Sequence, residues 1–190
     1  MKKATTLLLI AIAVSLTTYA QDKQFSSASK FIERSSYVQI NLDANEKATF
    51  KSGLGETVDF YSAEIIDLKK NEKMYGLNVE SSFITSQYGM TTTIARETAW
   101  VGMEEIGDMI VWLENYIIPN LELEAGKKKT VRYIFNSDEI MLKFEIYNNT
   151  QIFSVLLNNT QYPDKYFWTE TRVKDIPKVL TVLKYLQTKK

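Results

Sequence analysis

The chain contains no cysteine and no histidine. These two absences exclude Ser-His-Asp and Cys-His nucleophile systems, zinc sites built on either residue, and haem ligation by them. They also exclude disulfide bonds. The Gly53-Leu54-Gly55 turn lacks the glycine fingerprint and lysine of a phosphate loop, and no acidic run has the spacing of a calcium loop. We therefore expect no cofactor and no bound metal.

An excess of charge of either sign is also missing, because 23 Lys and Arg residues balance 23 Asp and Glu residues. Proteins that bind nucleic acids usually carry more basic than acidic residues, so we expect no nucleic-acid partner. The run Lys127-Lys128-Lys129 is a local exception, which we interpret as a solvated turn before a strand.

The first residues have the three-part order of a secretory signal peptide. Lys2 and Lys3 precede an apolar run over residues 7–16, and Thr18-Tyr19-Ala20 forms a small-residue cleavage site. A membrane anchor is the alternative, but the apolar run is about half of the roughly 20 residues that span a bilayer. We expect cleavage after residue 20 and a periplasmic or extracellular protein that spans no membrane afterwards. A bacterial cell envelope fits both the short lysine segment and the lack of cysteine.

The residues after the leader are long enough for one domain with an adequate core. Residues 21–36 are rich in serine and predict a mobile lead-in, with a short helical turn around Phe31 and Ile32. Residues 37–190 predict a single α+β domain. Its first part, residues 37–42 and 48–51, alternates apolar and polar side chains as strands do.

From residue 57 the pattern predicts strands and then a helix, twice over. Strands are expected at 58–68, 74–84 and 91–101 and again at 130–136, 140–147, 151–157 and 165–172. Helices are expected at 103–118, capped by Gly102 and Glu105, and at 175–187, with Pro177 in the first turn. The two helices carry the same apolar stripe in the same register. We therefore predict an antiparallel sheet built from two β-β-β-α repeats, about 57–119 and 128–190, with both helices packed on it. A continuous sheet without repeat symmetry is the alternative.

Carboxylates are the first candidates for chemistry. Glu104, Glu105 and Asp108 could form an acid/base or calcium cluster, but the first turn of a helix also favours negative charge for reasons of structure alone. Asp138 and Glu139 fall in a predicted hairpin turn, where Asp is common.

Aromatic residues are the second candidates. Tyr162, Tyr166 and Trp168 cluster around a Pro-Asp turn and could form a platform for a sugar ring, a peptide or a lipid. On an alternating strand Tyr166 and Trp168 share one face and Phe167 the other, so part of the cluster belongs to the core. Trp112 lies off the apolar stripe of its helix, which could mark an interface.

These observations favour an exported envelope protein that is a non-enzymatic domain binding a small ligand or another envelope protein. A carboxylate-dependent hydrolase of envelope or extracellular polymers is one alternative. A structural or assembly protein that pairs through an exposed edge strand is the other.

Overall fold

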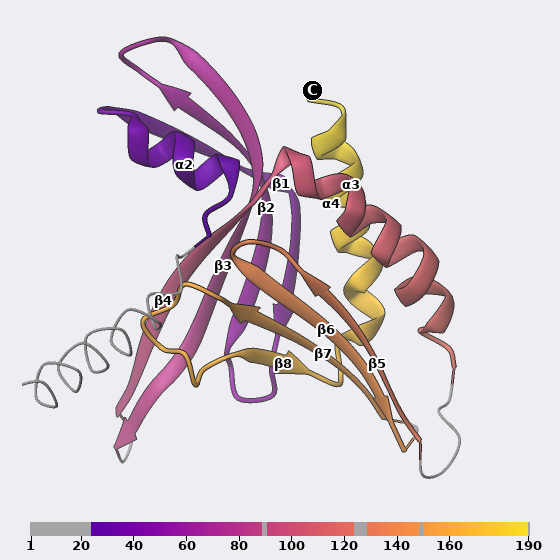
Figure 1. The fold of residues 1–190 in the computed structure, drawn as a ribbon. Helices are drawn as coiled ribbons and strands as arrows, with labels where there is room; N and C mark the ends of the chain where they lie inside the picture. The colour runs from indigo at the N-terminus through magenta and orange to yellow at the C-terminus, as the bar shows by residue number, and fades with distance from the viewer. Residues whose placement is uncertain (1–23, 89–90, 124–128, 149, 190) are drawn as a thin grey trace, which may run out of the picture.

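The computed structural model describes residues 24–88, 91–123, 129–148 and 150–189. These residues form an α+β fold with two four-stranded antiparallel sheets (Figure 1). The first sheet has the strand order β1-β2-β3-β4 and the second the order β5-β6-β7-β8. Every strand therefore pairs with its neighbour in the chain. The α+β class and the antiparallel pairing predicted from the sequence are confirmed.

The first sheet is followed by a helix that changes its winding near its end. Helix α3 continues through a π-helical turn, Leu113–Ile117, into the 3-10 turn Ile118–Asn120, and Pro119 ends it as predicted. The predicted cap is present, because the Glu105 carboxylate accepts a hydrogen bond from the Gly102 amide. The elements of this half are β1 Val38–Lys51, β2 Thr57–Asp67, β3 Glu72–Tyr88, β4 Thr91–Gly102 and α3 Met103–Trp112.

The second half follows the predicted order closely. Its last strand is shorter than expected, because the chain turns between Tyr162 and Lys165 before it and at Arg172 after it. A 3-10 turn at Val173–Asp175 leads into the final helix. The elements are β5 Thr130–Asn136, β6 Ile140–Tyr147, β7 Thr150–Leu157, β8 Phe167–Thr169 and α4 Ile176–Gln187.

The predicted single sheet is replaced by two sheets that share one core. Strands β6 and β7 lie against β4 but pair with no strand of the first sheet. Both sheets bury large apolar side chains on one face, so they pack through those faces; Phe50 and Phe153 meet with ring centroids 5.2 Å apart. Helix α4 packs on β1, β2 and β3, and α3 packs on β3 and β4, so both helices cover the first sheet as expected.

Two differences concern the start of the domain. The strands expected at 37–42 and 48–51 are one strand, β1, whose pairing with β2 is irregular between Leu42 and Lys47. Part of the expected lead-in is helix α2, Ser27–Arg34, and not only a short turn. The Ser26 hydroxyl caps α2 by accepting from the Ser29 amide, and Phe31 is buried against the first sheet.

Helix α2 covers the face of the first sheet that points away from the main core. Its Ala28 and Phe31 form a second apolar cluster with Ala63, Ile65 and Trp100. Figure 1 shows α2 beside the first sheet, away from α4. The predicted signal peptide and cleavage site lie outside the described residues. Within those residues, the structure has no helix with the length and apolar character needed to cross a bilayer.

Candidate functional site

The acidic residues at the start of α3 hold backbone segments together. Glu104 accepts hydrogen bonds from the amide and the hydroxyl of Ser27, at 3.1 and 2.6 Å. Glu105 accepts from the amides of Gly102 and Asp138, at 3.3 and 3.0 Å. Burial raises the pKa of Glu105 above its ordinary value in spite of these bonds. Asp108 is exposed, so the three carboxylates do not converge on one point.

Glu139 has a larger structural role than its place in a turn suggested. It is 4% exposed and accepts three hydrogen bonds within 3.0 Å, from the Ser26 amide and hydroxyl and from the Trp100 amide. One carboxylate thereby joins the cap of α2, the outer edge of β4 and the β5–β6 turn. The residue follows Asp138 in a predicted turn, and nothing local in the sequence marked its side chain as buried.

The predicted aromatic cluster is divided in the structure. Phe167 is fully buried in the core, while Tyr166 and Trp168 point the other way and are 47% and 41% exposed. This alternation agrees with the strand pattern. Tyr162 stands apart, with its ring edge-on to Phe83 at a centroid distance of 5.4 Å. Two of the three predicted binding residues therefore lie together, and the third does not join them.

Tyr166 and Trp168 belong to a wider exposed surface, the outer face of the second sheet. It consists of the alternate side chains that point away from the core, including Arg132 and Ile134 of β5, Lys143 and Glu145 of β6, Ile152 of β7 and Trp168 of β8. None of the described helices packs on this face of the sheet. Ile134, for example, is 48% exposed on it.

A shallow depression of about 310 Å³ lies on this outer face. Tyr166 and Trp168 line it together with the charged residues Lys143, Glu145 and Glu170. Ser154 also lines it and is 1% exposed. Glu145 bonds to Arg132 across the β5–β6 pair, so the outer face carries aromatic rings near its β8 edge and a paired charge near its β5 edge.

The other two tryptophans are core residues. Trp112 is 7% exposed and packs on Phe135 with ring centroids 5.9 Å apart, so the expectation that it marks an interface is wrong. It lies off the stripe that faces the first sheet because a second layer, β5, covers α3 from another side. Trp100 is also 7% exposed and packs in the cluster under α2.

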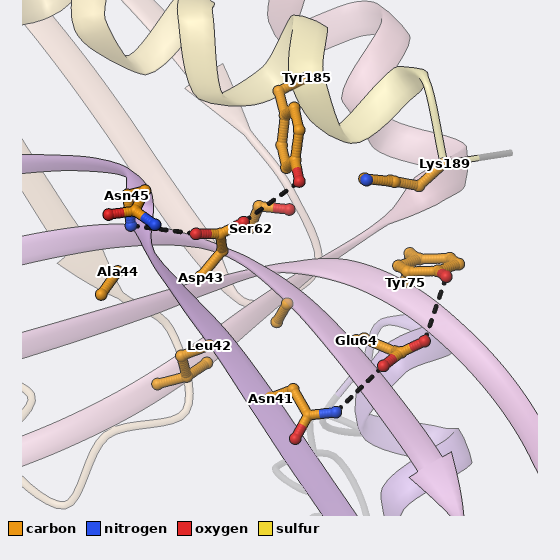
Figure 2. A pocket seen from close by; sticks show the side chains of 11 residues that line it. Asn41, Leu42, Asp43, Ala44, Asn45, Ser62, Glu64, Tyr75, Tyr185 and Lys189 are labelled. Carbon is orange, nitrogen blue, oxygen red and sulfur yellow. Dashed lines mark hydrogen bonds between the residues drawn. The ribbon is translucent and has the colours of Figure 1, made fainter.

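A second cavity, which we call the polar pocket, lies between the end of α4 and strands β1, β2 and β3. Its volume is about 480 Å³. The irregular part of β1 forms one wall, and Tyr185 and Lys189 close it from the C-terminal side (Figure 2). Its residues are Asn41, Leu42, Asp43, Ala44, Asn45, Ser62, Ala63, Glu64, Tyr75, Tyr185 and Lys189.

Two hydrogen-bonded carboxylates face this pocket. Asp43 accepts from the Asn45 amide at 3.0 Å and from the Tyr185 hydroxyl at 3.1 Å, and the Asn45 amide is the main reason that the pKa of Asp43 is lowered. Glu64 accepts from Lys73 at 2.9 Å and from Asn41 at 3.0 Å, and the bond from Lys73 is the main cause of its lowered pKa. Both groups are therefore ionised at neutral pH.

The polar pocket was not predicted from the sequence. Asp43 and Tyr185 are 142 residues apart in the chain, and no spacing rule connects them. The one local sign was the break in strand pattern between residues 42 and 48, which becomes the irregular wall formed by β1.

In the described parts of the chain, no three acidic side chains lie close enough together to hold a metal ion. Comparisons with protein-family models, with curated proteins and with solved structures found no match to this chain.

Proposed function

We propose that this protein is a non-enzymatic binding domain of the cell envelope, which docks another protein on the outer face of its second sheet. The observation that supports this most directly is the pair Tyr166 and Trp168, which are 47% and 41% exposed on a sheet face without a helix among the described residues. Large aromatic side chains left in water on a regular surface are a common sign of an interaction site.

The composition of the outer face favours a protein partner over a lipid. Trp, Tyr and Arg are the residues most enriched at the centres of protein interfaces, and this face presents Tyr166 and Trp168 near its β8 edge and Arg132 with the aliphatic Ile134 on β5. The ion pair between Arg132 and Glu145 on the same face would be costly to bury in a lipid phase.

The depression beside Trp168 gives the face a place for one inserted side chain. Its aromatic residues offer contact area, and Lys143, Glu145 and Glu170 offer partners for a polar end group. A partner residue with an apolar stem and a polar tip would use both parts. We expect such a residue at the centre of the interface.

Photocrosslinking tests the proposal in the native envelope. A photoreactive phenylalanine analogue at position 168 should trap one defined protein, and the same analogue at Tyr37, which is 66% exposed elsewhere, should not. The purified partner should bind Trp168→Ala at least about ten-fold more weakly than wild type, as expected for a central interface residue. Tyr37→Ala is the matched control. Equal crosslinking at both positions, or unchanged affinity of Trp168→Ala, would contradict the proposal.

We also propose that the chain is exported and loses residues 1–20, on the evidence of the leader pattern alone. The measurement is the mass of the N-terminal peptide of protein isolated from cell fractions. Protein from the periplasm or medium should begin at Gln21. An intact Met1 in protein confined to the cytoplasm would contradict export.

The two strand-then-helix halves support the proposed repeat, although each sheet has four strands where three per unit were expected. In this proposal both halves derive from one unit whose helix packs on a shared core. The second half then differs in leaving its outer face bare for a partner. The test is to produce each half as a separate chain and mix the two. If the mixed halves fold together, the result would support two units. If the mixture stays unfolded, the result would count against the repeat.

A further inference from the structure

We propose that the polar pocket is a binding site for a small uncharged saccharide, a monosaccharide or disaccharide. This site lies on the first sheet and is separate from the outer face of the second sheet. At about 480 Å³ the pocket falls within the range of small-molecule sites, and it is large enough for one or two sugar rings.

The charges in the pocket are largely compensated by one another. Asp43 and Glu64 are ionised, but Lys73 pairs with Glu64 at 2.9 Å, and Lys189 places its ammonium group 4.4 Å from the Tyr185 ring, beside Asp43 (Figure 2). A ligand with a net charge would meet its like charge as well as its opposite. The pocket therefore favours a ligand that is polar and carries no net charge.

The pocket still has free capacity for hydrogen bonds. Asp43 Oδ2 and Glu64 Oε2 each accept one bond from the described residues, from Tyr185 and from Asn41, and a carboxylate oxygen has room for a second. The ammonium of Lys189 forms no ion pair with a described residue and can donate. Several hydroxyl groups on one ligand could use these positions together.

Ser62 adds a hydroxyl group to the lining of the pocket. The residue is 4% exposed and lies on the same strand as Glu64. A hydroxyl can donate one hydrogen bond and accept others, so the Ser62 side chain offers a partner to a ligand hydroxyl.

Two tyrosine rings complete the chemistry. Tyr75 and Tyr185 come from β3 and α4 and border the pocket from different sides, as Figure 2 shows. Aromatic faces suit the C–H surfaces of a sugar ring, while the surrounding carboxylate, amide and hydroxyl groups suit its edge. Cyclic polyols combine these two surfaces in one uncharged ring.

Ligand-detected NMR and calorimetry test the proposal with a defined panel. The probes are glucose, galactose, N-acetylglucosamine, maltose and cellobiose, with glutamate and lysine as charged probes of similar polarity. We expect at least one saccharide to bind and neither amino acid to do so. Binding of an amino acid with no saccharide binding would overturn the proposed class, and no binding at all by the folded protein would overturn the site.

Variants locate the binding. Ser62→Ala should lower the affinity for the saccharide at least about five-fold, since it removes one hydrogen bond to the ligand and adds no bulk to the strand. Tyr185→Phe keeps the ring, removes the hydroxyl that holds Asp43, and should weaken binding to a similar extent. Trp168→Ala should leave saccharide binding unchanged, which separates this site from the proposed protein-docking face. Unchanged affinity in Ser62→Ala, with its fold verified by circular dichroism, would overturn the placement.

Discussion

The two sheets have the same strand order but are covered differently. The first sheet packs its inner face on α3, α4 and the second sheet, and α2 covers one end of its other face. The second sheet buries only its inner face, and its outer face keeps Tyr166 and Trp168 in water. Since the same antiparallel meander serves both, this contrast separates the residues needed for folding from those available for binding.

The largest expected effect comes from the inner face of the second sheet. Phe153 is fully buried and touches Phe50 of the first sheet, so Phe153→Ala should lower the free energy of unfolding by about 3–5 kcal/mol. Ile152, its neighbour on the outer face, is the matched control, and Ile152→Ala should lower it by less than about 1 kcal/mol. Urea denaturation of both variants gives the comparison. Similar losses for the two would mean that the outer face is also structural.

The second-largest effect concerns helix α2, which packs on the outer side of the first sheet. Glu139→Ala leaves the buried amides of Ser26 and Trp100 without their acceptor and should lower the free energy of unfolding by about 2–3 kcal/mol. Hydrogen exchange should show faster exchange of the α2 amides in this variant while those of β6 and β7 change little. Uniform acceleration over both sheets would argue against a local role.

The third effect is a dependence on pH at the polar pocket of the first sheet. The pKa of Asp43 is lowered in the folded protein, chiefly by the Asn45 amide, so its ionised form adds stability above about pH 4, and the gain is lost as the pH falls through the folded value. The difference in unfolding free energy between wild type and Asp43→Asn should therefore shrink from pH 6 to pH 3. Thermal melts across this range measure it. A difference that grows on acidification would show that the sign is wrong.

The smallest expected effect on stability is at the surface proposed for docking. Trp168→Ala should change the free energy of unfolding by about 1 kcal/mol or less, because much of the side chain already contacts water. The same variant should remove most of the tryptophan fluorescence that acrylamide quenches, since Trp100 and Trp112 are each 7% exposed. Undiminished quenching would mean that Trp168 is covered in solution, for example by a second copy of the chain.

The sequence predicted those elements whose signal is local. Helix α4 and strands β5 to β7 follow from apolar periods of 3.6 and 2, and their bounds agree with the structure to within a residue or two. The alternation of Tyr166, Phe167 and Trp168 was also readable, because neighbouring side chains on a strand must point to opposite faces.

The remaining features depend on contacts between distant segments. The division into two sheets is decided by how β4 meets β6 and β7, which no periodicity within one strand encodes. The residues next to Glu139 in the sequence do not distinguish it from an exposed carboxylate in a turn. It becomes a buried acceptor because Ser26, 113 residues away, packs against it. The polar pocket likewise exists only when Tyr185 reaches Asp43.

The Glu139 contact also has a consequence for the order in which the protein can assemble. Ser26 and Glu139 are 113 residues apart, so α2 is synthesised early but its carboxylate acceptor is synthesised late. The apolar partners of α2, which are Ala63, Ile65 and Trp100, all belong to the first half of the chain. The helix can therefore reach its place on the first sheet before the second sheet exists, but the Ser26 and Trp100 amides then lack their carboxylate acceptor. Emergence of the β5–β6 turn completes the attachment of α2, so the second sheet stabilises the N-terminal helix without packing on it.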